Sequence, residues 1–258
     1  MIIDIHIHRG PSPDQFVDDL SLPRLLETMD TLGIQISISS NSLSLNYNDF
    51  EGGAKLACEE FDKSEGRVRS YFYYHPKIVD ESLRVMNVYR NQRAFCGVKI
   101  HPAITYTYGG DENYRPVWEF AARNELPIMS HTWDISSYNP KQKYAFPDTF
   151  EKYLKEYPSV PFIMAHAGGR YHGVLAAIKI GKIYPNVFYD IAGDIYANGF
   201  LERLVGEIGA SRVFYGSDCS MMDQRTMLGV VIGADISLND KTKILYKNAN
   251  EFFNFGLQ

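Results

Sequence analysis

Cysteine is scarce in this sequence of 258 residues, which contains only Cys58, Cys96 and Cys219. The three are widely spaced and form no CxxC pair, so neither a disulfide framework nor a thiolate zinc site is expected. Unpaired thiols are typical of a reducing compartment. We therefore expect a cytoplasmic protein.

Long apolar runs and an excess of positive charge are also missing. No run approaches about 18 apolar residues, and the first residues show no basic segment leading into an apolar one, so neither a membrane span nor a signal peptide is expected. The net charge is -5, with 26 scattered Lys and Arg residues. This balance argues against a nucleic-acid partner.

The sequence does contain eight short β-rich segments at intervals of roughly 30 residues, the size of a βα unit. They start at Ile2 (IIDIHIH), Ile34 (IQISIS), Arg67 (RVRSYFYY), Phe95 (FCGVKIH), Leu126 (LPIMSH), Val160 (VPFIMAH), Asn186 (NVFYDIAG) and Arg212 (RVFYGSD).

Segments with helical spacing of apolar residues lie between these strands. The clearest spans residues 22–32, with Ser21 as the predicted N-cap and Gly33 as the predicted end. The last helix is predicted to start behind a cap at Asn239 or Asp240. Strands that alternate with helices indicate a parallel sheet, because a parallel neighbour needs a crossover connection.

Eight such units predict a single-domain α/β protein over residues 1–258, folded as a closed (β/α)8 TIM barrel. A doubly wound open sheet is the alternative, but no GxGxxG motif follows the first strand. Residues 40–49, 103–115 and 132–148 are predicted to be long irregular loops after strands. In a barrel such loops form the C-terminal face, where active sites lie.

The first strand carries two histidines, His6 and His8. Residues two apart on a strand point to one face, so both are predicted to face the barrel interior, while Ile5 and Ile7 face the helices. A buried imidazole is costly unless it is hydrogen-bonded or bound to a metal. A lone histidine is more often an ordinary hydrogen-bonded core residue, but the pair favours a shared cation.

Further metal-ligand residue types end later strands: His101, His131, His166 and Asp218. Imidazole and carboxylate groups at three or four positions suit zinc, manganese or iron in an open site. The scarcity of cysteine argues against a closed structural zinc site. We therefore predict a catalytic metal centre at the C-terminal ends of the strands.

Six motifs occur together in the chain in order: DIHIH, GVKIHP, SH, AHAGG, GSD and ILYKNANEFF. In this the sequence resembles the amidohydrolase superfamily, specifically the amidohydrolase-2 group of metal-dependent TIM-barrel enzymes. The resemblance spans nearly the whole chain. It implies a hydrolase, lactonase or decarboxylase that acts on a small, often carboxylated molecule.

The resemblance also implies roles for individual residues. His6, His8, His131 and Asp218 would bind one divalent metal ion, with zinc expected ahead of manganese or iron. His166 would act as a general acid and base, a task that suits an unperturbed histidine pKa of about 6.5. Asp218 would also accept a proton from a water molecule that the metal activates.

Four further residues are candidates for substrate binding: Lys99, His101, Arg170 and Trp133. In binuclear relatives a lysine at the position of Lys99 is carboxylated and bridges two metals, but the amidohydrolase-2 pattern implies a single metal here. Arg170 would bind a substrate carboxylate, although a solvated surface role is equally compatible with a loop arginine.

Acidic residues near the ligands are candidate orienting partners. Either Asp190 or Asp194 is expected to hold a ligand histidine, depending on where the seventh strand ends. Asp4, placed on the same face as His6, is a second such candidate. His75, at the end of the third strand, is a weaker candidate for lining the pocket.

We therefore expect metal-dependent hydrolysis of a small amide, ester or lactone, with decarboxylation of a carboxylated acid as the alternative. Two other classes remain open: a barrel that binds metal without turnover, and a barrel nuclease, which the acidic balance and Lys99 disfavour. The expected partner is a small-molecule substrate, and a homo-oligomer is compatible with the sequence.

Overall fold

A computed structural model describes residues 1–12 and 19–257. Eight parallel strands pair in sequence order, each with the next along the chain, and confirm the predicted TIM barrel. The strands are β1 (Ile2–Arg9), β2 (Ile34–Asn41), β3 (Val68–Tyr73), β4 (Phe95–Ile100), β5 (Ile128–His131), β6 (Phe162–Ala165), β7 (Val187–Asp190) and β8 (Val213–Phe214).

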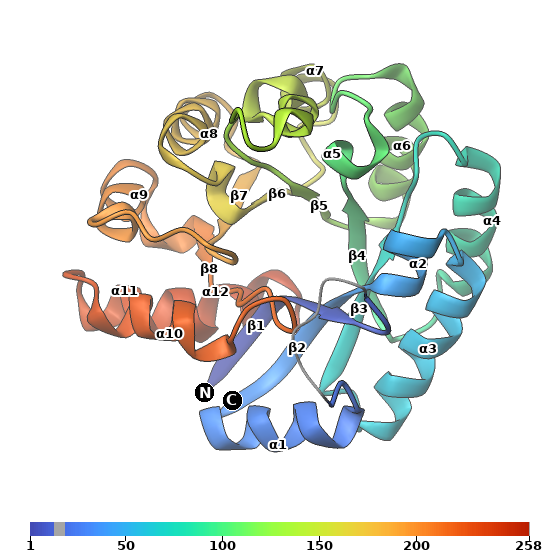
Figure 1. Ribbon diagram of the computed structural model, residues 1–258, viewed down its shortest axis with the longest axis horizontal. Helices are drawn as coiled ribbons and strands as arrows, with labels where there is room; N and C mark the ends of the chain where they lie inside the picture. Colours follow the sequence, from blue (N-terminus) through green and yellow to red (C-terminus); the bar gives the residue numbers. More distant parts are fainter. Residues whose placement is uncertain (13–18, 258) are drawn as a thin grey trace.

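Helices form an outer ring around the strands (Figure 1). They are α1 (Leu22–Leu32), α2 (Ser42–Tyr47), α3 (Phe50–Lys63), α4 (Val79–Tyr89), α5 (Pro102–Thr105), α6 (Arg115–Asn124), α7 (Glu151–Glu156), α8 (Tyr171–Ile183), α9 (Phe200–Ile208), α10 (Gln224–Gly233), α11 (Leu238–Thr242) and α12 (Asn248–Phe252). In the described ranges, no helix is both long and apolar enough to cross a membrane.

The end signals read from the sequence are right for α1 and wrong for the last helical segment. The Ser21 hydroxyl accepts a hydrogen bond from the Arg24 amide, and Gly33 ends α1 with a φ of 72°. The cap of α11, however, is Ser237, whose side chain accepts from the Asp240 amide. Asp240 is therefore an early residue of that helix rather than its cap.

The three stretches predicted to be irregular contain short helical segments. Residues 40–49 include α2, residues 103–115 include most of α5 and a 3-10 turn, and residues 132–148 include a 3-10 segment at Pro140–Ala145. That expectation was wrong because one or two helical turns are too short to give the apolar periodicity by which a helix is recognised.

Backbone hydrogen bonds join the two ends of the sheet. The Ile5 amide donates to the Tyr215 carbonyl at 3.1 Å, and the Asp218 amide donates to the His6 carbonyl at 2.8 Å. The Tyr215 amide donates to the carbonyl of Ile244, which lies in a π-helical turn between α11 and α12. The last helices thus help to hold the end of the barrel beside β1.

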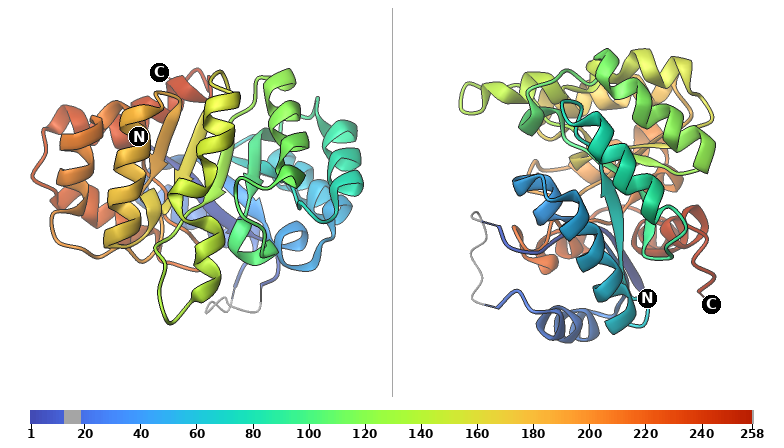
Figure 2. Two further views of the ribbon diagram at one scale, coloured as in Figure 1. Left: turned by 90° about the horizontal axis from the view of Figure 1, so that it is seen from above. Right: turned by 90° about the vertical axis from the view of Figure 1, so that its right-hand side faces the viewer.

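The barrel interior is apolar at one end. Strands on opposite sides of a barrel can share a cluster of side chains only in its interior. Side chains from six strands form such a cluster at this end: Ile3, Ile5, Ile36, Ile38, Tyr71, Met129, Ile163, Ala165 and Phe214. Phe252 at the end of α12 and Phe253, which follows it, pack against this cluster. Both termini lie at this end (Figure 2).

An irregularity in β1 corrects two predictions. The pairing of β1 with β2 shifts register between Asp4 and Ile7, so Ile5 joins the interior cluster, while Ile7 packs against Leu25 and Met29 of α1 as expected. Asp4 accepts hydrogen bonds from the Ser217 hydroxyl and the Gln224 amide group. It therefore ties β1 to the start of α10. It also accepts from the His6 backbone amide at 3.2 Å, whereas the His6 ring pairs with Asp190.

Candidate metal centre and active site

A cavity of about 540 Å³ opens at the C-terminal ends of the strands. Its lining includes eight predicted site residues that share this end of the barrel: His6, His8, Lys99, His101, His131, His166, Arg170 and Asp218. Trp133 also lines it. His75 is not among the residues that line this cavity.

His6 is held by a buried carboxylate from β7. Its Nδ1 atom lies 2.9 Å from Oδ2 of Asp190, and both side chains are almost completely buried. Burial lowers the pKa of His6 to about 4, with Lys99 acting in the same direction. The neutral ring donates from Nδ1 to Asp190, so the lone pair on Nε2 faces the cavity.

Of the two candidates Asp190 and Asp194, Asp190 is the acid that holds the His6 ring. Its carboxylate accepts from His6 Nδ1 and from the backbone amides of His166 and Ala192, at 2.8 to 2.9 Å. Burial acts to raise its pKa, but His6, His166 and Lys99 outweigh burial and lower it to about 2. With three donors around it, Asp190 orients its neighbours. Its carboxylate also belongs, with His6 and His166, to one of the two groups of described residues able to hold a metal ion.

Three predicted ligands converge at the cavity floor. Oδ1 of Asp218 lies 3.0 Å from Nε2 of His8 and 3.5 Å from Nε2 of His6. Burial opposes ionisation of Asp218, but a hydrogen bond with His8 and electrostatic interactions with His6 and His166 hold its pKa well below the usual value. Two imidazole nitrogens and a carboxylate oxygen at this spacing form one of the two groups of described residues able to hold a metal ion.

His166 stands beside this group in an unusual backbone conformation. It follows β6 with a φ of 63°, and its Nδ1 lies 2.9 Å from the Ala192 carbonyl oxygen. Because a carbonyl only accepts, Nδ1 carries the proton and Nε2 carries a lone pair. The ring centre lies 5.0 Å from that of His6, so His166 sits next to the predicted metal position.

Lys99 places a cation at the same floor. Its Nζ lies 2.9 Å from Nε2 of His6. Burial lowers the pKa of Lys99 to about 8, against the opposing effect of Asp190 and Asp218. Its side chain is nearly inaccessible, so only a group that reaches the cavity floor can meet it.

His131 lies in the cavity but belongs to neither of the two ligand groups among the described residues. Its Nε2 lies 2.9 Å from Oε1 of Gln142, and its ring stacks on His101 with centres 4.1 Å apart. Burial lowers the pKa of His131 well below the usual value, as do His166 and Lys99. Its assignment as a ligand stays a prediction.

The mouth of the cavity carries the other substrate-binding candidates. Arg170 is more than half exposed and pairs with Asp194 at 2.9 Å; its binding of a substrate carboxylate stays a prediction. The Trp133 ring packs at 5.2 Å from that of His166. Both residues are placed to contact the outer part of a bound molecule.

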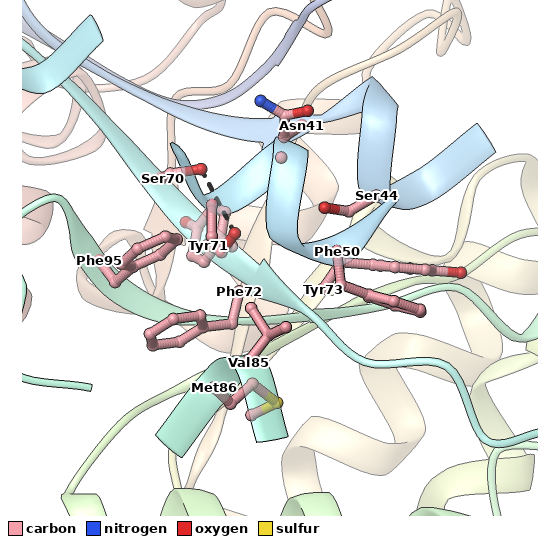
Figure 3. Close-up of a pocket in the computed structure, with 12 residues that line it drawn as sticks. Asn41, Ser44, Phe50, Ser70, Tyr71, Phe72, Tyr73, Val85, Met86 and Phe95 are labelled. Atoms are coloured by element: carbon pink, nitrogen blue, oxygen red, sulfur yellow. Dashed lines mark hydrogen bonds between the residues drawn. The ribbon is translucent and has the colours of Figure 1, made fainter. Parts of the chain in front are cut away.

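A second cavity lies between β3 and the helices α3 and α4 (Figure 3). It measures only about 10 Å³ and is lined mainly by apolar and aromatic side chains such as Phe72, Val85 and Met86, beside Asn41 and Ser44. Its lining includes no histidine, acid or base. It is a packing gap and does not compete as an active site.

The amidohydrolase family model, Amidohydro_2, matches residues 3–255. The chain belongs to the amidohydrolase family. Membership makes it a metal-dependent type of enzyme, in agreement with the two histidines and the aspartate at the cavity floor. No curated protein matches this amidohydrolase.

Solved structures share the fold at low sequence identity. An uncharacterised TIM-barrel protein from Bordetella bronchiseptica is 15% identical, with a TM-score of 0.78 and 98% of each chain covered. A dihydroxybenzoic acid decarboxylase from a Polaromonas species, with bound manganese and the inhibitor 2-nitroresorcinol, is 16% identical, with a TM-score of 0.71, covering 100% of this chain and 98% of its own.

A third structure, 4-oxalomesaconate hydratase from Rhodopseudomonas palustris, is 18% identical, with a TM-score of 0.74. The match covers 98% of this amidohydrolase and 96% of the hydratase. At such identities the likeness shows the shared barrel fold.

Proposed function

We propose that this amidohydrolase hydrolyses a small amide, ester or lactone with one divalent metal ion. The observation that carries the proposal is the convergence of His6, His8 and Asp218 on one point of the cavity floor. Ligand bonds of about 2.0–2.2 Å to one ion separate neighbouring donor atoms by roughly 3–3.5 Å, and the donor spacing here fits this. His131 is the proposed fourth ligand.

The donor set suits zinc first, with manganese and iron as alternatives. When bound, the ion supplies Lewis-acid polarisation of a substrate oxygen or a water molecule. The manganese in the similar Polaromonas structure supports a divalent ion in this fold. Three free cysteines support the proposed cytoplasmic location.

The chain's own groups cover the proton transfers of hydrolysis. The ionised carboxylate of Asp218 accepts a proton from the attacking water. His166, whose Nδ1 is fixed by the Ala192 carbonyl, takes up this proton at Nε2 and then donates it to the leaving group. The Trp133 ring beside His166 restricts access of bulk water to this point.

Decarboxylation is the second candidate, and Lys99 is the observation that favours it. A buried ammonium at the cavity floor is placed to hold an anionic group close to the metal position. The decarboxylase among the similar structures acts on a dihydroxybenzoic acid. On this alternative, His166 would protonate the carbon from which CO2 leaves.

A substrate panel separates the two reactions. The enzyme, reconstituted with zinc or manganese, is incubated with amides, esters and lactones and with carboxylated aromatic acids, while hydrolytic product and CO2 are measured. Hydrolytic product without CO2 is expected; CO2 without hydrolytic product would reverse the order of the two proposals. The proposed role of His166 is tested with the same substrates: His166→Asn should keep the metal content and lower turnover by about 10²–10⁴.

A further inference from the structure

Gln142 is a buried residue of the cavity wall to which no role has been given. It lies in the 3-10 segment Pro140–Ala145 and is 7% exposed. Its Oε1 lies 2.9 Å from Nε2 of His131. The two residues are 11 positions apart in the sequence. Among the described residues of this loop, only Gln142 has a side-chain hydrogen bond with a predicted ligand.

The amide oxygen determines which nitrogen of His131 carries the proton. An amide oxygen only accepts, so Nε2 must donate to it, and the neutral ring then carries its lone pair on Nδ1. In the proposed site, a metal ion bound by His131 would take this lone pair on Nδ1. Without an acceptor at Nε2, the ring would exchange between two tautomers, and one of them has a proton on Nδ1.

His101 adds a second restraint on the same ring. The two imidazoles are nearly parallel, at 10°, with centres 4.1 Å apart, and His101 itself begins α5, where its Nδ1 accepts from the Ile104 amide. The 3-10 segment that carries Gln142 packs on α5. One face of the His131 ring is thus supported by His101, and one edge by Gln142.

We infer that Gln142 is a positioning residue that holds His131 as the Nδ1-lone-pair tautomer and so couples the 132–148 loop to the metal centre. The inference rests on the proposed function, in which His131 is the fourth ligand. It concerns the metal-free protein as well, because a hydrogen bond between Gln142 and His131 does not itself require an ion.

Two substitutions isolate the acceptor. Gln142→Met keeps the side-chain length but has no oxygen, whereas Gln142→Glu keeps an oxygen that accepts from Nε2. Affinity for Zn²⁺ and Mn²⁺ is measured by competition with a chromophoric chelator, without substrate. We expect Gln142→Met to lose about 10–100-fold in metal affinity and Gln142→Glu to stay within a few-fold of the original protein or bind more tightly.

The tautomer is read directly by ¹⁵N NMR of the histidine rings in the metal-free protein, with His131→Gln to assign the signal. Protonated Nε2 is expected in the original protein and in Gln142→Glu, and a tautomer mixture in Gln142→Met. Unchanged affinity and tautomer in Gln142→Met would overturn the inference, as would equal losses in both variants. If the original protein binds no metal, the proposed function fails, while the tautomer measurement still decides the role of Gln142.

Discussion

At the scale of single residues, the site is organised around Asp190 rather than around a ligand. This one carboxylate receives the His6 ring from β1 and the backbone amide of His166 from the turn after β6. It therefore sets the direction of Nε2 in His6 and the position of the residue proposed for proton transfer. A change at Asp190 is expected to disturb both without removing any of the four proposed metal ligands.

The variant Asp190→Asn tests this. An asparagine amide can replace only one of the two oxygens as an acceptor, so its NH2 group must face either the His6 ring or the backbone donors. Metal affinity is expected to fall by about 10–100-fold, the usual effect of losing an orienting partner, as measured by chelator competition. Asp194→Asn, at a partly exposed position in the loop after β7, is the control and should leave metal affinity unchanged. Equal losses in both variants would point to a general charge effect.

At the scale of elements, the turn after β6 that carries His166 packs closely against the backbone at the start of α8. A Cβ atom on Gly173 would lie 1.8 Å from the Gly168 carbonyl oxygen, and one on Gly168 would lie 2.2 Å from the Gly173 carbonyl oxygen. Gly168 also has a φ of 86°. Two glycines therefore let the first turn of α8 pack against the turn that carries His166.

Gly173→Ala is expected to destabilise the protein, because its methyl group must displace backbone rather than a flexible side chain. Overpacking of this kind typically costs about 1–3 kcal/mol. Gly206→Ala in α9 is the matched control, since nothing lies within 4 Å of its added Cβ, and it should stabilise by about 0.5–1 kcal/mol. Urea unfolding measures both, and a stabilised Gly173→Ala would show that the turn has room to move.

At the scale of the whole molecule, the repeat of β-rich segments was enough to predict the barrel and the end at which His6, His8, His166 and Asp218 meet. The alternation of residue types in β1 did not indicate its register shift. It also did not indicate that the Asp4 carboxylate pairs with the Ser217 and Gln224 side chains instead of a histidine ring. Gln142 was missed for a related reason: it lies in a non-periodic loop, and only the folded loop brings it to His131.

The site also links the two ends of the chain, and metal binding should therefore stabilise the whole barrel. His6 and His8 belong to the first strand and Asp218 follows the last, so one ion would bridge the point where the sheet closes. At a free metal concentration 100 times Kd, binding adds about 2.7 kcal/mol, which raises Tm by roughly 5–10 °C for a chain of this size. Differential scanning calorimetry with Zn²⁺ or Mn²⁺ should show this increase in the original protein and none in the double variant His6→Ala/His8→Ala. Of the two groups of described residues able to hold a metal ion, only the one with His6, His8 and Asp218 joins β1 to the segment after β8. An equal increase in the double variant would therefore mean that the stabilising ion binds elsewhere.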